Sequence, residues 1–255
     1  MEAAHRQERL DAIDRLTESA SATESDIALL LGFLDDPDKQ VQRRAAEELA
    51  RRARFDVDVL VRLTACLADE PRARRWGAAY SLALIGPPPL AALPVLLEVL
   101  GHEDGDLRWA ASTLMRRMKA PIAAELVRLV IVGSPTQRKM ALYCLRDLGA
   151  DTPPVEQAIL AALADGDAGV RLAALSALSR VAVDRAIAAR RVSALVEDPD
   201  DGVRRAAIGA LGELGHRSSE VVELVRRAAS HPADAGLRRA ALRAMKRLET
   251  SPAES

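Results

Sequence analysis

The stretch DPDDGVRRAAIGALG at residues 198–212 decides the fold, because the chain repeats it. Self-similarity at a period of about 20–50 residues is typical of repeat proteins. A further segment, HPADAGLRRAALRAMK at 231–246, aligns with it after one extra residue. Five more align without gaps: DPDKQVQRRAAEELA (36–50), DEPRARRWGAAYSLA (69–83), HEDGDLRWAASTLMR (102–116), VGSPTQRKMALYCLR (132–146) and DGDAGVRLAALSALS (165–179).

The seven segments follow one another at a nearly constant interval of 33, 33, 30, 33, 33 and 34 residues. Each interval holds an apolar helical run, a polar turn with Asp, Pro or Gly, and a second helical run. We expect Asp36, Asp165 and Asp198 to cap the second helix, because their side-chain oxygens can accept from its first backbone N–H groups. Positions in each second helix are counted from one equivalent residue, which is called offset 0, so that offset +1 is the next residue along the chain. The seven residues at offset 0 are Val41, Arg74, Leu107, Gln137, Val170, Val203 and Leu237.

A helix pair of this kind cannot bury its apolar face alone, so neighbouring repeats must stack and share a core. Composition supports helices that pack through small side chains, since 49% of the residues are hydrophobic and only 2% are aromatic. These numbers argue against a β-sandwich or barrel. The sequence therefore predicts an all-α solenoid.

The repeat resembles the HEAT repeat in its bacterial, phycobilisome-lyase-like form, whose pattern approximates D-P-D-x-x-V-R-x-x-A-x-x-A-L. Residues 198–211 match this pattern almost throughout, and the resemblance covers about residues 24–249. It implies a right-handed α-solenoid of about seven antiparallel helix pairs. Most HEAT proteins bind partners along a concave surface lined by the second helices, while a few are phycobilin lyases or AlkD-like DNA glycosylases.

The expected organisation is a single HEAT-repeat solenoid domain over residues 1–255. We expect a capping helix within 1–20, because terminal repeats of solenoids need a polar outer face. We expect a disordered tail at 250–255. The seven repeats are expected at about 24–53, 57–85, 90–119, 121–149, 153–182, 184–215 and 218–249.

Charge, cysteines and hydropathy exclude several classes of protein. The 36 Lys and Arg nearly balance the 37 Asp and Glu, so no global positive field attracts nucleic acid or anionic lipid. With only Cys66 and Cys144, and no apolar signal core in the first residues, we expect neither a disulfide framework nor secretion. No apolar run approaches the roughly 20 residues of a membrane span, so we expect a cytoplasmic protein without membrane contact.

The second helix of each repeat has two distinct faces. Apolar or small residues recur at offsets 0, +4, +8 and +11, as in Val203, Ala207, Leu211 and Leu214, and predict the core face. Offsets +2, +6 and +9 form the opposite stripe, where eight side chains are basic and one, Glu47, is acidic. The predicted partner-binding residues on this stripe are Arg43, Trp76, Tyr80, Trp109, Arg116, Lys139, Tyr143, Arg146, Arg205, Arg239, Arg243 and Lys246.

Positive charge is concentrated in the second helices, which hold 24 Lys or Arg against seven Asp or Glu. Part of this excess is structural. Offset +1 is Arg in six of the seven repeats, and in the HEAT family this arginine typically pairs with a turn aspartate of a neighbouring repeat. The resemblance therefore implies a stabilising role for Arg75, Arg108, Arg138, Arg171, Arg204 and Arg238.

Both Trp and both Tyr residues of the chain lie on the outward stripe. Trp76 and Tyr80, Trp109 and Tyr143 occupy three consecutive repeats, where aromatic rings beside arginine can stack on bases or anchor an apolar side chain of a partner. The structural alternative is that Trp76 and Trp109 only pack on each other across adjacent repeats.

The sequence offers no set of residues for catalysis, a metal or a cofactor. His102 and His231 occupy the turn position that Asp holds elsewhere, which indicates capping rather than metal binding, and neither cysteine has a second one nearby. Nucleotide-binding and nucleophile-elbow motifs are absent from the sequence. A hydrolytic glycosylase needs a carboxylate among the aromatics, and the stripe offers only Glu47. We therefore expect no enzyme.

Three functions are compatible with these observations. The leading hypothesis is a non-catalytic scaffold whose basic, aromatic-bearing concave surface engages an acidic protein segment. The second is binding of nucleic acid through the same groove. The third is a lyase-like chaperone for a small acidic ligand such as a tetrapyrrole.

Overall fold

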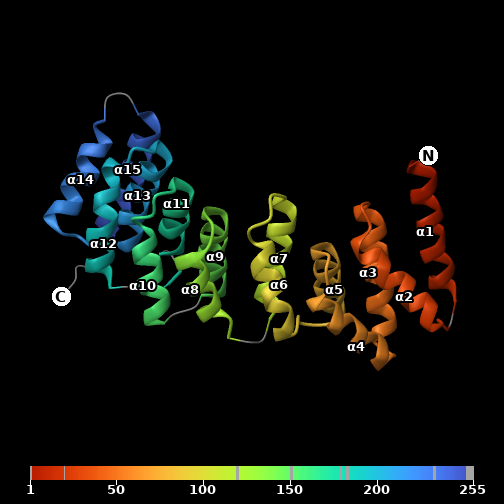
Figure 1. The fold of residues 1–255 in the computed structure, drawn as a ribbon. Helices are drawn as coiled ribbons and strands as arrows, with labels where there is room; N and C mark the ends of the chain where they lie inside the picture. Colours follow the sequence, from red (N-terminus) through yellow and green to blue (C-terminus); the bar gives the residue numbers. More distant parts are fainter. Residues whose placement is uncertain are drawn as a thin grey trace. The chain divides into compact units, whose positions relative to one another are not determined.

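The computed structural model describes residues 2–19, 21–118, 121–149, 152–178, 180–181, 184–231 and 234–250. Within these residues it contains fifteen α-helices and no strand (Figure 1), which confirms the all-α prediction. The helices are α1 (Glu2–Glu18), α2 (Glu24–Gly32), α3 (Lys39–Ala53), α4 (Val57–Ala65), α5 (Arg72–Ile85), α6 (Leu93–Val99), α7 (Gly105–Arg117), α8 (Ala123–Val132), α9 (Pro135–Leu148), α10 (Pro153–Ala162), α11 (Ala168–Ala177), α12 (Arg185–Ser193), α13 (Asp201–Leu214), α14 (Ser219–Ala229) and α15 (Ala235–Thr250).

The helices after α1 form seven consecutive pairs, from α2 with α3 to α14 with α15, in the expected order. Short 3-10 turns extend several first helices, among them η4 at Ala194–Glu197. Of the tail predicted at 250–255, Thr250 ends α15 and residues 251–255 lie outside the described part of the chain. No helix in the described ranges is both long and apolar enough to cross a membrane.

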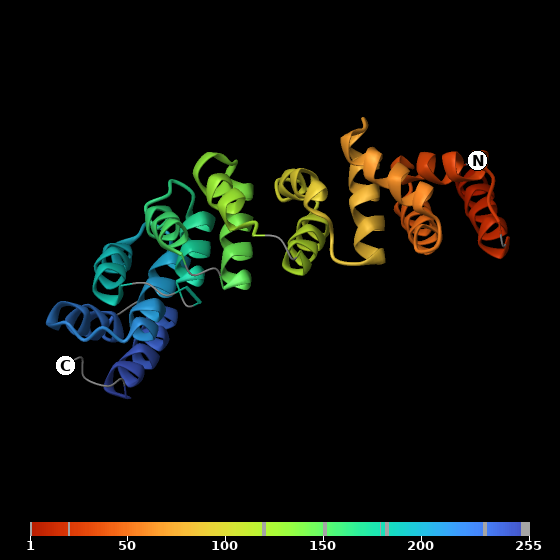
Figure 2. The same cartoon turned by 90° about the horizontal axis from the view of Figure 1, so that it is seen from below.

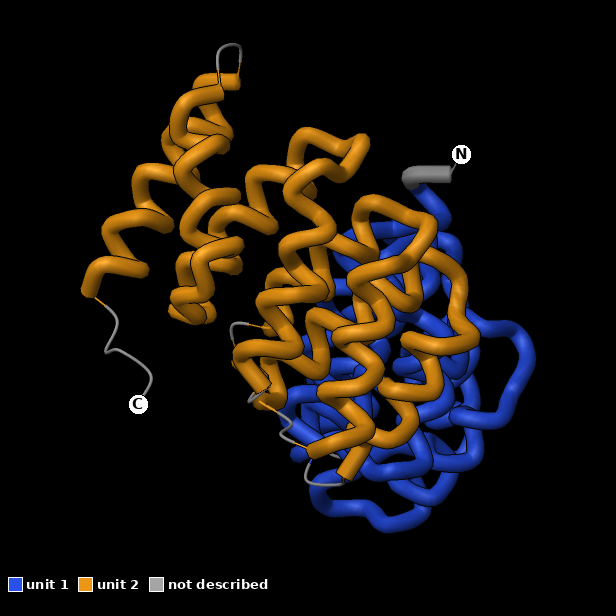
Figure 3. Tube along the Cα trace, turned by 90° about the vertical axis from the view of Figure 1, so that its left-hand side faces the viewer, with its two compact units in different colours: residues 1–120 blue, residues 121–255 orange. Residues whose placement is uncertain are grey.

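Contacts between helices divide the chain into two compact units, residues 1–120 and residues 121–255 (Figure 3). In unit 1, α1 packs on α3 and α3 packs on α5. In unit 2 the second helices stack in chain order, α9 on α11, α11 on α13 and α13 on α15 (Figure 1, and from below in Figure 2). Each unit is thus a stack of helix pairs, and the single continuous domain over 1–255 stays a prediction.

The core of each stack consists of the residues that the helical period predicted. Val203, Ala207 and Leu211 are fully buried, and Leu214 is 8% exposed. Burial of this apolar stripe on the second helix of each pair supplies the main free-energy gain of the fold. An isolated pair would leave the stripe exposed to water.

The second helices begin two residues later than the turn aspartates suggested. Asp38, Asp167 and Asp200 are the N-cap residues, and Asp200 accepts from the backbone N–H of Val203 at 2.9 Å. The prediction that Asp36, Asp165 and Asp198 cap these helices is wrong, because a capping oxygen must lie two or three residues before the N–H it accepts. These aspartates instead accept the N–H of the capping residue itself, as Asp198 does from Asp200 at 2.9 Å.

Helix α1 covers the first repeat, as the prediction of a capping helix requires. Arg9 in α1 binds the turn carboxylate of Asp36, with Nε 2.7 Å from Oδ2. Near the C-terminal end of α1, the carbonyl of Leu16 accepts a hydrogen bond from the buried Arg52 of α3. The Nε of Arg52 donates to Glu48. Arg52 occupies a core offset, so its charge is stabilised there by the carboxylate and by the unsatisfied carbonyls at the end of α1.

Close approach of α13 and α15 depends on a single glycine. A Cβ atom on Gly212 would lie 2.6 Å from the Cα of Ala244 and 2.7 Å from its Cβ. Gly209, one turn earlier in the same helix, has no such neighbour within 4 Å. Packing therefore requires a glycine at position 212 of α13 but not at position 209 of the same helix.

We expect Gly212→Ala to lower the free energy of unfolding by about 1–3 kcal/mol, because α13 and α15 must separate to admit the methyl group. Gly209→Ala is the matched control and should raise it by roughly 0.5–1 kcal/mol, because alanine favours helix. Urea unfolding followed by circular dichroism measures both. Equal stability of the two variants would contradict the close contact at Gly212.

Candidate binding surface

The predicted partner-binding residues lie on the second helices of both units. Unit 1 carries Arg43, Trp76, Tyr80, Trp109 and Arg116, and unit 2 carries the remaining seven. Every one of the twelve is exposed or half-buried. The exposed residues are Arg43, Trp109, Arg116, Arg205, Arg239, Arg243 and Lys246. The half-buried residues are Trp76, Tyr80, Lys139, Tyr143 and Arg146.

The strongest run of positive charge lies on α15. Arg239, Arg243 and Lys246 are spaced by four and three residues, so they share one face of the helix. All three side chains are exposed, and within the described residues none of them forms an ion pair. This face of α15 therefore carries three exposed positive charges that no carboxylate of the described residues pairs.

On α9 the basic and aromatic residues contact each other. The guanidinium of Arg146 lies over the ring of Tyr143, 5.0 Å from its centroid. Arg146 also donates to the hydroxyl of Ser176 on α11 at 2.9 Å and pairs with Asp147 at 2.8 Å. These contacts fix the guanidinium and neutralise part of its charge, so Arg146 joins two repeats as well as lining the surface.

Residues at offset +2 in unit 2 lie against a glycine that begins the second helix of the next repeat. A Cβ on Gly169 would lie 3.5 Å from the side chain of Lys139, and one on Gly236 would lie 2.9 Å from Arg205. Arg205 in addition pairs with Asp234 of the next repeat at 3.5 Å. The stems of Lys139 and Arg205 therefore contribute to packing between repeats, while their charged ends stay near the surface.

In unit 1 the aromatic rings do not behave alike. The ring of Trp76 stacks on Tyr80 of the same helix, with centroids 6.1 Å apart and planes 29° apart. Trp109 is 69% exposed, which argues against the alternative that it merely packs on Trp76. Arg43 pairs with Glu47 at 3.5 Å, so its charge is partly compensated.

Offset +9 was expected to face outward, and this is wrong at three positions. Ala50, Ala83 and Gly212 are buried. Successive helices in a stack lie so close that the next repeat can cover a small residue at offset +9, as Ala244 covers Gly212. Ser179, at this offset in the fifth repeat, lies outside the described residues, and among the described ones the side chains that reach the surface are long.

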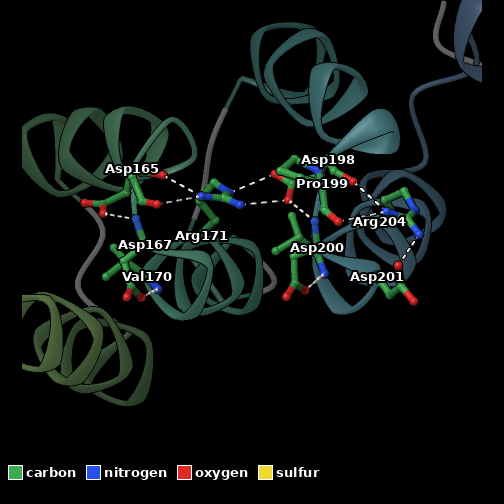
Figure 4. Close-up of polar contacts among 11 residues, drawn as sticks. Asp165, Asp167, Val170, Arg171, Asp198, Pro199, Asp200, Asp201 and Arg204 are labelled. Carbon is green, nitrogen blue, oxygen red and sulfur yellow. Dashed lines mark hydrogen bonds and ion pairs between the residues drawn. The ribbon is translucent and has the colours of Figure 1, made fainter.

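Two of the arginines at offset +1, Arg138 and Arg171, link neighbouring repeats through turn aspartates, and we call the six arginines at this offset the arginine ladder. Figure 4 shows Arg171 and Arg204. Arg171 binds Asp198 of the next repeat through two hydrogen bonds of 2.8 and 2.7 Å, and its Nη1 donates to the carbonyl of Asp165 in its own turn. Arg138 binds Asp165 in the same way, at 2.8 and 2.7 Å. For these two arginines the pairing that the HEAT resemblance implied is confirmed.

The other arginines of the ladder have different partners. Arg75 binds Glu98, a residue of the first helix in the next repeat, and Arg204 binds Asp201 of its own helix, so the implied pairing is wrong for these two. The turns that follow them in the chain have a histidine, not an aspartate, at the ladder position. Arg108 and Arg238 donate to the turn carbonyls of His102 and His231.

The ladder changes the ionisation of its carboxyl groups. Burial by itself would raise the pKa of Asp198, but the hydrogen bonds from Arg171 and from the N–H of Asp200 outweigh it and hold the pKa below its ordinary value. The pKa of Asp165 is lowered for the same reasons, with Arg138 as its partner. Both groups are therefore anionic at neutral pH.

Two histidines bind the backbone of their own turns, and Cys66 is a buried thiol. Nδ1 of His102 accepts from the N–H of Asp104 at 3.0 Å, and Nδ1 of His231 accepts from that of Asp234 at 3.1 Å. Burial raises the pKa of Cys66 to about 11, so its thiol stays protonated and is a poor nucleophile. Among the described residues no three His, Cys, Asp or Glu side chains are grouped as a metal site.

A hollow that the sequence analysis did not predict opens in unit 2, near the turn between α14 and α15. Its volume is about 280 Å³. A signal for it was present in the alignment of repeats, because Arg227 lies four positions before the turn, where five of the other six repeats have a small or acidic residue and the fourth has Arg128. The lining residues are Val196, Glu197, Arg204, Leu224, Arg227, Ala228, His231 and Leu237.

The chain matches the family model of HEAT repeats over residues 27–115 and 188–254, which together exceed half of its length. It therefore belongs to the HEAT repeat family. A comparison with curated proteins found no matching relative.

Two solved structures illustrate the shared fold. The complex of CpcE and CpcF of phycocyanin lyase from Nostoc sp. PCC7120 matches with 20% identity and a TM-score of 0.53, over 62% of this chain and 99% of that chain. The YibA protein of Escherichia coli matches with 15% identity and a TM-score of 0.50, over 95% of this chain and 97% of that chain. At these identities the likeness concerns the fold alone.

We expect Asp198→Asn to lower the free energy of unfolding at pH 7 by about 3 kcal/mol, because Arg171 is left buried without its carboxylate. Since the folded pKa of Asp198 lies below the unfolded value of about 3.9, its contribution is present above that pH and is lost as the pH falls through the folded pKa. Denaturant unfolding at several pH values should therefore show wild type and variant converging in acid.

Asp201→Asn is the control for this pair, because Asp201 is exposed and its contact with Arg204 is screened by water. It should change stability much less than Asp198→Asn. A difference between wild type and Asp198→Asn that does not depend on pH would contradict the role of the ion pair.

Proposed function

We propose that this HEAT protein is a non-catalytic scaffold that binds an acidic segment of a partner protein on the basic stripe of its second helices. The observation that carries the proposal is the exposed, unneutralised row of Arg239, Arg243 and Lys246 on α15. Family membership supports a binding role, because HEAT repeats generally serve as protein-binding scaffolds.

The spacing of this row suits an acidic helix. From Arg239 to Lys246 the helix rises by about 10 Å, so carboxylates four and three residues apart on a partner helix would match the three cations in turn. One exposed pair contributes only roughly 0.2–1 kcal/mol, but an array of complementary charges steers association and fixes register. Tyr143 beneath Arg146 adds an aromatic contact elsewhere on the same unit.

We expect fluorescein-labelled poly-L-glutamate to bind the full chain with a dissociation constant that rises steeply between about 50 and 500 mM salt, since exposed charges are screened. The double variant Arg239→Glu, Arg243→Glu should raise that constant at least about tenfold at low salt, because two attractive contacts become repulsive. Fluorescence anisotropy measures both effects.

The matched control is Arg190→Glu with Arg191→Glu, which makes the same change in charge at two exposed positions of α12 in the same unit. It should leave binding within about twofold of wild type, apart from the general effect of net charge. An equal loss in the two double variants would show that the α15 face is not the site. In extracts of the native cell, a specific protein partner should be lost from the α15 double variant and retained by the α12 double variant. Treatment with nuclease should not release this partner, because it is held by protein contacts and not through nucleic acid.

Nucleic acid is the second candidate, and the exposure of Trp109 favours it. An exposed indole can stack on an unpaired base, and such stacking is worth about 1–3 kcal/mol per base. Arg116, two turns later on the same helix, is also exposed. In this case the basic residues of the stripe would bind phosphates, and no catalytic step is implied.

If nucleic acid is the ligand, a single-stranded dT oligomer should bind more tightly than poly-L-glutamate, and log affinity should fall linearly with log salt. Trp109→Ala should then weaken single-stranded binding more than duplex binding, because only unpaired bases stack on the ring. Anisotropy with both nucleic acids tests this, and the absence of binding at about 50 mM salt would exclude it.

A further inference from the structure

The hollow in unit 2 lies at a defect in the arginine ladder. Asp165 and Asp198 each hold the arginine of the preceding repeat at 2.7 and 2.8 Å. In the last repeat the equivalent turn position is His231, whose Nδ1 accepts from Asp234 and so fulfils only the local role of the aspartate. The carboxylate that should meet Arg204 is missing from this turn.

Arg204 is nevertheless held as its counterparts are. Its Nη1 donates to the carbonyls of Asp198 at 2.7 Å and Pro199 at 3.2 Å, just as Arg171 donates to Asp165 and Gly166 (Figure 4). Because the same turn contacts orient it, its guanidinium lines the hollow where the next repeat would supply a carboxylate. Its carboxylate contact is Asp201, an exposed residue three positions earlier on its own helix.

At the other histidine turn, a carboxylate from elsewhere in the same repeat takes the place of the missing aspartate. His102 replaces the turn aspartate in the third repeat, and there Glu98, four residues earlier, binds Arg75 at 2.8 Å. Four repeats keep their turn aspartate, and the residue four positions before it is small in each of them: Gly32, Ala65, Ala161 and Ala194. In the last repeat this position is Arg227, which adds a second guanidinium instead of a carboxylate.

We propose that this hollow is a binding site for a carboxylate that carries an apolar body, and that the bound carboxylate takes the place of the missing ladder aspartate. Arg204 and Arg227 provide two guanidinium groups, which bind a carboxylate in bidentate fashion. Leu224, Ala228 and Leu237 provide the apolar wall for the rest of the ligand.

Glu197 is the one acidic residue of the lining, and it is exposed. The two guanidinium groups outnumber this one carboxylate, so the balance of charge in the lining favours an anion. A volume of about 280 Å³ accommodates a small organic acid or one acidic side chain with its neighbours. This site does not depend on the stripe proposed above for the acidic partner.

The test uses calorimetry of the full chain with hexanoate, and with hexanamide and hexyl phosphate as matched probes. We expect hexanoate to bind and hexanamide not to bind, because only the charged group satisfies both guanidinium groups. Absence of hexanoate binding, or tighter binding of hexyl phosphate, would overturn the assignment to a carboxylate.

Two variants place a carboxylate inside the hollow and should abolish hexanoate binding. His231→Asp restores the ladder residue found in the preceding repeats, and Arg227→Glu copies Glu98 of the third repeat. Both should also raise the melting temperature of the free protein, because Arg204 gains a partner. Unchanged hexanoate binding in both variants would overturn the proposal.

The controls change the same charges elsewhere. Arg226→Glu alters the neighbouring residue, which is exposed and pairs with Glu223 outside the hollow. His102→Asp alters the other histidine turn, where Arg75 already has Glu98. Both controls should keep hexanoate binding, and its loss in either would show that general charge, not the hollow, decides binding.

Discussion

One guanidinium group joins each pair of neighbouring repeats in the best-formed part of the stack. Arg171 satisfies the carbonyls of its own turn and at the same time binds the carboxylate of Asp198 in the next turn. Repeats of a solenoid contact only their neighbours, so register must be set locally at each junction. A planar, bidentate ion pair is suited to this because it tolerates little change in position, and its burial makes a mismatched neighbour costly.

The departures from this ladder are as informative as the ladder itself. Three turns have lost their aspartate: the fourth repeat has Val132 at this position, and the third and last repeats have a histidine. Both histidines keep the local hydrogen bond to the backbone. The third repeat supplies a carboxylate from its first helix, at Glu98, whereas the last repeat places Arg227 at the same position. One junction is thereby complete within the chain, and the other combines two cations with an open volume. A defect of this kind in an otherwise regular pattern is where an external group can bind without disturbing the stack.

The basic stripe has a mixed character that follows from its position at the edge of the repeat junctions. Lys139, Arg146 and Arg205 use their stems or charged groups to contact the next repeat, and only their remaining surface is open to a partner. On α15 no repeat in the structure follows, and Arg239, Arg243 and Lys246 stay exposed together. The exposure of the basic groups therefore differs along the chain, although the residue types at these offsets are similar.

The sequence by itself determined the all-α class, the seven helix pairs, the capping helix and the buried face at offsets such as Val203, Ala207 and Leu211. These features are local, since helical period and turn chemistry act over a few residues. Only the tertiary structure decided that Asp200 and not Asp198 caps its helix, that Gly212 is buried, and that Arg75 binds Glu98 and Arg204 binds Asp201. These properties depend on which atoms of the neighbouring repeat lie within a few ångströms, and a periodic pattern along one chain does not contain that distance.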